Sequence, residues 1–140
     1  MIKNPKELHD FKVILLGIVY DTKRKKILIG RRENDPFVKN LKWTPPGGRV
    51  NHGEDLEIAL KTKIKEQTGL EVANHGHIFS MIPKEKNNFI LILYLCEVLH
   101  GKEKAGGNLK EIKWVNPEEL DDYFDVGYHP HLREYILNLR

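Results

Sequence analysis

The central part of the chain combines two glycines with a polar helix face, which together could hold a divalent cation against a phosphate. Gly47 and Gly48 follow two prolines, and glycine lets the backbone approach a ligand closely. Farther along, Lys63, Glu66 and Gln67 occupy the polar side of a predicted helix. A backbone carbonyl and carboxylates would give Mg²⁺ an all-oxygen site, which substrate phosphates and water complete. The spacing therefore indicates phosphate chemistry, although lysine and glutamine stand where acids would be expected.

The helix that positions this face is predicted from Glu54 to Gly69. Leu56, Leu60 and Ile64 recur every four residues and predict one apolar stripe on the side opposite the polar face. The glycine at the end of the segment supplies the C-terminal stop. The pattern therefore predicts a helix whose apolar side packs on a sheet and whose polar side faces the glycines.

The rest of the chain predicts strands around this helix and two shorter helices after them. Apolar, β-branched runs indicate strands, and Asn116 followed by Pro117 marks a helix start. Strands are predicted at residues 11–21, 25–32, 71–82, 87–99 and 107–116, an extended segment at 43–50, and helices at 117–124 and 129–139. Mixed strands with such helices favour an α/β fold in which helices cover both faces of a sheet.

Length, composition and charge fit a soluble globular protein with a single domain, residues 1–140. Charged residues make up 31% of the chain and hydrophobic residues 40%. The 23 basic and 20 acidic residues leave a net charge of +3, spread along the chain. This small excess suits an anionic small ligand and is weak support for nucleic-acid binding. The N-terminus shows no signal-peptide pattern, and the apolar run from Val13 to Tyr20 is too short to span a membrane.

Cys96 is the single cysteine of the chain, so no intramolecular disulfide can form. That composition is compatible with a reducing compartment, and we expect the protein in the cytoplasm. The residue lies in the apolar run FILILYLCEVL, which predicts a small core residue rather than a nucleophile.

The glycine pair and the helix after it resemble a Nudix box. That family pattern is a glycine, five residues, a glutamate, seven residues, then Arg-Glu-aliphatic-any-Glu-Glu-any-Gly-aliphatic. The matching positions are Gly48, Glu54, Ile64, Glu66, Gly69 and Leu70. Three positions depart from it: Thr62 stands for the arginine, Lys63 for the next glutamate, and Gln67 for the second glutamate of the pair. With the preceding WTPPGG and the later IKWVNPEEL, the resemblance covers about residues 11–125.

The resemblance implies a Nudix-type α/β/α sandwich with a mixed sheet and a MutT-like hydrolase that uses Mg²⁺ or Mn²⁺. The expected substrate is a nucleoside diphosphate linked to another group. The expected metal ligands are Glu66, the Gly48 carbonyl and, as auxiliaries, Gln67 and Asn108. Glu54 is the remaining acid that could activate water. For Lys63 two interpretations stay open, a fixed cation that stabilises phosphate charge and a solvated surface lysine.

Four further residues are candidates for substrate binding. Arg31 and Arg32 are adjacent on a predicted strand, so they point to opposite faces and at most one should face the site. Phe37, in the next loop, could stack on a base or anchor the loop. His129 lies in the segment GYHPHL, where the resemblance implies contacts with the base.

Two alternative functions remain open beside the hydrolase. Loss of two box carboxylates favours a catalytically impaired Nudix domain that binds a nucleotide or a protein. The run PGGRV also resembles GDP-mannose hydrolases, but the histidine expected from them falls on Leu109. No membrane partner is expected, and a homodimer stays an open alternative.

Overall fold

The computed structural model describes residues 12–33, 43–51, 53–82, 88–123 and 130–138. Its elements are β1 (Lys12–Asp21), β2 (Lys26–Arg31), β3 (Trp43–Thr44), β4 (Gly47–Arg49), α2 (Leu56–Thr68), β5 (Leu70–Met81), β6 (Phe89–Gly101), β7 (Glu111–Val115), the 3₁₀ turn η1 (Pro117–Glu119), α3 (Leu120–Tyr123) and α4 (Pro130–Leu137). Each predicted strand and helix corresponds to one of these elements. The largest difference is at β7, because the predicted strand begins at residue 107 and the observed one begins at Glu111.

One mixed sheet forms the centre of the molecule. Its strands follow the order β3-β2-β1-β6-β5, with β4 paired to β1 and β7 paired to β2. The central pair, β1 and β6, is parallel, and the other pairs are antiparallel. The parallel pair explains the uninterrupted apolar runs of both strands, because such strands are covered on both faces.

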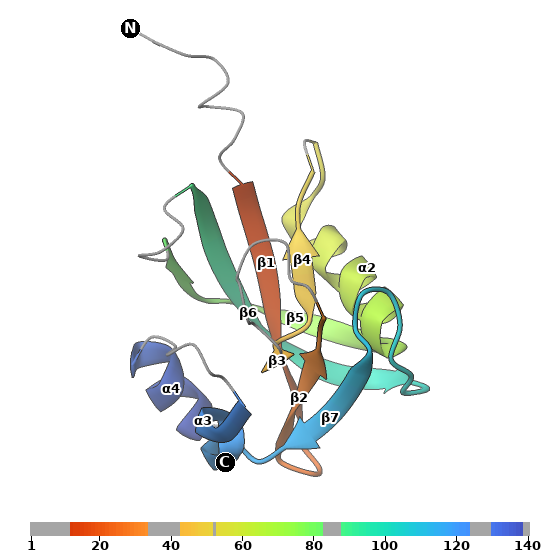
Figure 1. The fold of residues 1–140 in the computed structure, drawn as a ribbon, viewed down its shortest axis with the longest axis vertical. Coiled ribbons are helices and arrows are strands. Elements are labelled where there is room, and N and C mark those ends of the chain that lie inside the picture. The colour runs from red at the N-terminus through yellow and green to blue at the C-terminus, as the bar shows by residue number, and fades with distance from the viewer. Residues whose placement is uncertain (1–11, 34–42, 52, 83–87, 124–129, 139–140) are drawn as a thin grey trace, which may run out of the picture.

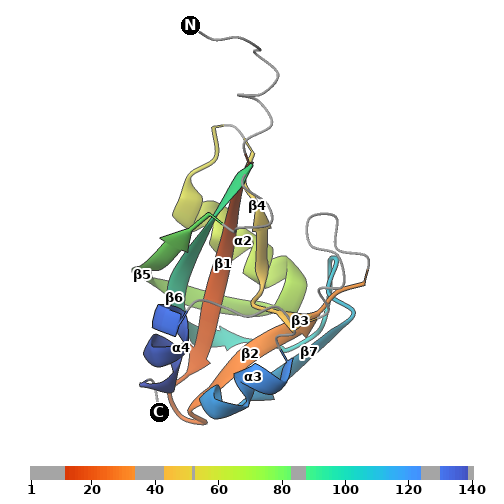
Figure 2. The ribbon, with the colours of Figure 1, turned by 60° about the vertical axis from the view of Figure 1, so that its left-hand side comes forward.

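Helices cover the two faces of this sheet, with α2 on one face and α3 and α4 on the other (Figures 1 and 2). On the α2 face, Leu15 of β1 belongs to a buried cluster with Leu60 and Ile64. On the opposite face, Ile18 of β1 belongs to a second buried cluster, which includes Ile136 of α4. Side chains alternate along a strand, so β1 contributes to both cores. The predicted α/β/α arrangement is confirmed.

Helix α2 ends at the expected glycine, but its apolar side differs from the predicted stripe. The Asp55 side chain caps the N-terminus, and Gly69 ends the helix in the left-handed conformation, with φ 79°. Leu56 is 38% exposed, whereas Gln67 is only 6% exposed. The prediction for these two residues was wrong because Gln67 lies three residues after the buried Ile64, on the same side of the helix.

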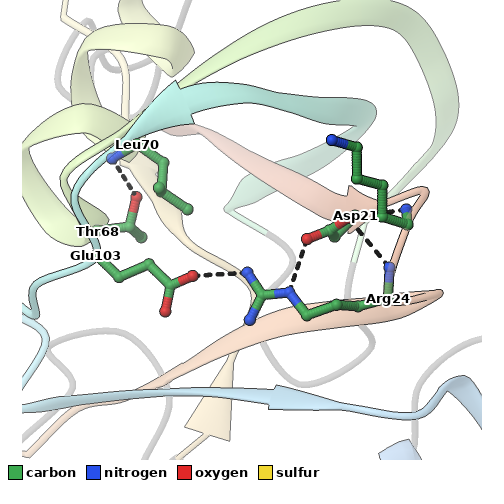
Figure 3. A network of polar contacts seen from close by, with 6 residues as sticks. Asp21, Arg24, Thr68, Leu70 and Glu103 are labelled. Atoms are coloured by element: carbon green, nitrogen blue, oxygen red, sulfur yellow. Dashed lines mark hydrogen bonds and ion pairs between the residues drawn. The ribbon is translucent and has the colours of Figure 1, made fainter.

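The segment after β6 is held to the rest of the molecule at two places. Its backbone amides at Lys104 and Gly106 donate to the last carbonyls of α2, at 2.9 and 3.0 Å. Farther from the helix, Arg24 of the β1–β2 turn bonds to Asp21 and to Glu103, each at 2.7 Å (Figure 3). These contacts fix the course of the chain toward Asn108.

Cys96 is fully buried in the core, as predicted. Burial raises the pKa of its thiol to about 12, so the reactive thiolate does not form near neutral pH. Within the described parts of the chain, no helix has the length and apolar character needed to cross a membrane.

Candidate functional site

Strand β4 brings the glycine pair against β1 at very close range. Gly47 lies opposite Leu16 in the antiparallel ladder and has φ +147°, a conformation that favours glycine. A Cβ atom on this residue would collide with the carbonyl oxygen of Leu15. Any larger residue at position 47 would therefore push β4 away from the sheet.

The backbone groups of β4 point alternately toward β1 and toward α2. The carbonyl of Pro46 accepts a hydrogen bond from Gly17 of β1 at 2.8 Å, so it faces the sheet. By the alternation of an antiparallel pair, Gly48 also faces β1, whereas Gly47 faces away. The carbonyl that turns toward α2 therefore belongs to Gly47, whereas the carbonyl of Gly48, the expected metal ligand, faces β1.

Gln67 binds both backbone groups of Gly47. Its Oε1 accepts from the Gly47 N–H at 2.8 Å, and its Nε2 donates to the Gly47 carbonyl at 2.8 Å. The same Nε2 donates to Oδ1 of Asn108 at 2.9 Å. A carboxylate could not form the two bonds from Nε2, because it has no N–H to donate. The oxygens of Gln67 and Asn108, expected as auxiliary metal ligands, thus each accept a hydrogen bond within this group.

A cleft of about 400 Å³ opens beside this group. Its lining residues are Ile14, Arg32, Gly47, Gly48, Arg49, Asn51, Lys63, Glu66, Gln67, Gly107 and Asn108. Lys63 lies directly over Gly48, since a Cβ atom on that glycine would be 3.3 Å from Lys63 Cδ and 3.9 Å from its Nζ. The missing side chain of Gly48 therefore makes room for the lysine.

The charged side chains of the cleft are Arg32, Arg49, Lys63 and Glu66. Among the residues that the structure describes, the side chains of Lys63, Glu66 and Arg49 form no hydrogen bond or ion pair. Lys63 is half-buried, whereas Glu66 and Arg49 are exposed. Three cations and one carboxylate thus meet in one cleft, and the balance favours an anionic ligand.

A second cavity of about 290 Å³ adjoins the first and shares Lys63 and Glu66 with it. Glu54, the other candidate acid, lines this second cavity. Its Oε1 accepts a hydrogen bond from the backbone N–H of Asn51 at 2.6 Å. Both acids of the box therefore border the second cavity, and Glu66 also borders the first, whereas Glu54 does not.

The candidate substrate residues separate into two groups. Arg32 lines the cleft, while Arg31 bonds to Glu33 at 3.0 Å and to Glu111 at 3.1 Å. This agrees with the expectation that at most one of the two arginines faces the site. Phe37 and His129 lie outside the described residues.

The oxygen donors of the cleft differ in how well they fit a divalent cation. The Glu66 carboxylate fits an ion that arrives with phosphate oxygens, since Mg²⁺ sites often use one or two carboxylates. The Gly47–Gln67–Asn108 group does not fit an ion, because an amide nitrogen already lies between its oxygens. Among the described residues, no group of three or more His, Cys, Asp or Glu could hold a metal. The described residues alone therefore do not complete a metal site.

A model of the NUDIX domain matches residues 10–136. The chain belongs to the Nudix family. It is 35% identical over 101 residues to an ADP-ribose pyrophosphatase of Methanocaldococcus jannaschii, covering 70% of this chain and 59% of that relative. It is 36% identical over 115 residues to an 8-oxo-dGTP diphosphatase of Buchnera aphidicola, covering 80% of this chain and 82% of that one.

The fold agrees with solved Nudix structures. The MutT protein of Methanosarcina mazei superposes with a TM-score of 0.72 at 17% identity, covering 99% of this chain and 96% of that one. Nudix hydrolases generally use divalent metal ions. The chain therefore has the fold of these Nudix structures, and the departures of its box from the family pattern lie in the side chains of Thr62, Lys63 and Gln67.

Leu109 decides how the chain compares with the GDP-mannose branch of the Nudix family. It is 3% exposed and packs against Gly30, where a Cβ atom would collide with its side chain. A buried apolar residue thus occupies the position where that branch would need a histidine. The structure offers no replacement at this position.

Arg49 is a cleft residue that the sequence analysis did not identify. It follows the glycine pair in β4 and is exposed at the cleft. The sequence signal that could have identified Arg49 is its position directly after Gly48 in an extended segment. Without the pairing of β4 and β1, the direction of its side chain could not be assigned.

Proposed function

We propose that this Nudix chain hydrolyses a nucleoside diphosphate linked to another group, with Mg²⁺ or Mn²⁺ entering together with the substrate. The observation that carries the proposal is the single cleft that holds Glu66 and three cationic side chains. The cations suit the charges of a diphosphate, and Glu66 is an anionic oxygen ligand with no partner among the described residues. The curated relatives named for ADP-ribose and 8-oxo-dGTP hydrolysis support this substrate class.

The reaction would be an attack of water on one phosphorus, with cleavage of the bridging P–O bond. The leaving phosphate takes the bonding electron pair, and a carboxylate accepts the proton of the attacking water. Arg32, Arg49 and Lys63 line the cleft and would bind the non-bridging oxygens. Glu66 and Glu54 border the two cavities and are the candidate proton acceptors. A divalent ion, when bound with the substrate, offsets charge on the phosphate oxygens.

A second function, nucleotide binding without turnover, is favoured by one specific observation. Gln67 keeps the Gly47 carbonyl and Asn108 in hydrogen bonds that a metal ion would have to break. Each broken hydrogen bond in a buried place costs about 1–3 kcal/mol. This cost works against strong metal binding in that part of the cleft.

The test is a screen of a nucleotide library with Mg²⁺ and with Mn²⁺, measuring released phosphate or nucleoside monophosphate. ADP-ribose and 8-oxo-dGTP are tried first, because the relatives carry those names. We expect release from at least one linked nucleoside diphosphate. No release with either metal, together with measurable nucleotide binding, would replace the hydrolase by the binding function.

A further inference from the structure

The amide group of Gln67 lies where the oxygens of two chain segments converge. Its Nε2 is 2.8 Å from the Gly47 carbonyl oxygen and 2.9 Å from Asn108 Oδ1. A cation that bound both oxygens would have to displace this NH₂ group. The amide already performs the structural task of such a cation, because it joins β4 to the segment after β6 with two donated bonds.

The side chain of Lys63 brings a positive charge to the cleft that Gln67 and Asn108 also line. Its alkyl chain crosses Gly48, and its half-buried position limits how far the ammonium can move from the cleft. Glu66 is three residues away on α2, yet the two side chains form no ion pair. Among the described residues the ammonium has no ion-pair partner that would compete with a ligand, and Arg49 adds a second cation to this cleft.

We propose that Gln67 and Lys63 divide the two tasks of a metal ion between them, so that the cleft binds a diphosphate without a divalent cation. Gln67 orders the oxygens of Gly47 and Asn108, and Lys63 supplies positive charge to the phosphate oxygens. The ligand class rests on the proposed function. Hydrolysis, by contrast, is not needed for this binding and keeps its own requirement for metal.

Calorimetric titration of inorganic pyrophosphate into the whole chain, once in EDTA and once in MgCl₂, tests the inference. We expect the Kd in EDTA to lie within about threefold of the Kd in MgCl₂. Lys63→Gln should weaken binding in EDTA by about tenfold or more, as loss of a charged hydrogen bond does. Lys61→Gln is the matched control, because Lys61 is exposed on the same helix and does not line the cleft.

A second variant should reverse the metal requirement. Lys63→Glu places a carboxylate near Glu66, so pyrophosphate binding should vanish in EDTA and return in MgCl₂. A thermal melt of each variant shows that it is folded. Wild-type binding that disappears in EDTA, or Lys63→Gln binding as tightly as wild type, would overturn the inference. Binding in EDTA by a chain that hydrolyses nothing would preserve the inference and end the hydrolase proposal.

Discussion

The β1–β2 turn and the cleft beside Gly48 both gather opposite charges, but Lys63 and Glu66 of the cleft do not pair with each other as the charges of the turn do. At the turn, Arg24 bonds to Asp21 and Glu103 (Figure 3). Its guanidinium also lies 4.3 Å from the ring centroid of Trp114. In the cleft, Lys63 and Glu66 make no ion pair with the described residues. Charges that neutralise each other fix the chain, whereas charges without a protein partner can act on a ligand. The cleft is therefore suited to binding a ligand, whereas the ion pairs of the turn stabilise the fold.

The largest effect in this comparison is expected from Glu66→Gln. The change keeps the size of the side chain but removes the charge that would hold a metal with the substrate. Once a substrate is found, kcat/KM at saturating Mg²⁺ should fall by about a hundredfold, equivalent to about 2.7 kcal/mol. Glu57→Gln is the control, because Glu57 is exposed on the same helix and lines neither cavity. An unchanged kcat/KM in a folded Glu66→Gln protein would move the chemistry away from this carboxylate.

The next largest effect is expected on stability rather than on catalysis, from a substitution of Gln67 instead of the adjacent Glu66. Gln67→Leu leaves the buried N–H and carbonyl of Gly47 without their side-chain partner. We expect the free energy of unfolding to fall by about 1–3 kcal/mol, measured by urea denaturation. Thr62→Ala, at an exposed site of the same helix, should change it by less than about 0.5 kcal/mol. Equal stability of Gln67→Leu and wild type would mean that the amide does not hold β4 in solution.

The smallest effect is expected at the paired turn, with Asp21→Asn. The hydrogen bond from Arg24 lowers the pKa of the Asp21 carboxyl, so the folded state gains stability while this group is ionised. The variant keeps an oxygen for the turn amides and should lose less than about 1 kcal/mol at neutral pH.

The pH dependence of this difference follows from the direction of the shift. A lowered folded-state pKa gives a contribution that is complete above the unfolded value, about 3.9, and is lost as pH falls through the folded value. The stability difference between Asp21→Asn and wild type should thus be constant from pH 7 to about pH 5 and shrink below about pH 4. Denaturation series at several pH values measure it, and a difference that grows on acidification would contradict the assignment.

The sequence by itself determined the elements and most of the core of this protein. The apolar run of β1, the Gly69 end of α2 and the box spacing are local features, because each depends on a few neighbouring residues. Resemblance to the Nudix box then located the cleft through Gly48 and Glu66. These predictions held because helix ends, strand runs and turns depend mainly on neighbouring residues.

Only the tertiary structure decided which residues of the site contact one another and which way their polar groups point. Gln67 forms hydrogen bonds with Gly47, which is 20 residues away in the sequence, and with Asn108, which is 41 residues away. Partners this distant cannot be predicted from a local sequence pattern. The carbonyl that faces α2 is set by the register of β4 on β1, and a shift of one residue would exchange Gly47 for Gly48. The place of the Lys63 ammonium likewise depends on the packing of α2 over Gly48, because a long flexible side chain takes its direction from what surrounds it.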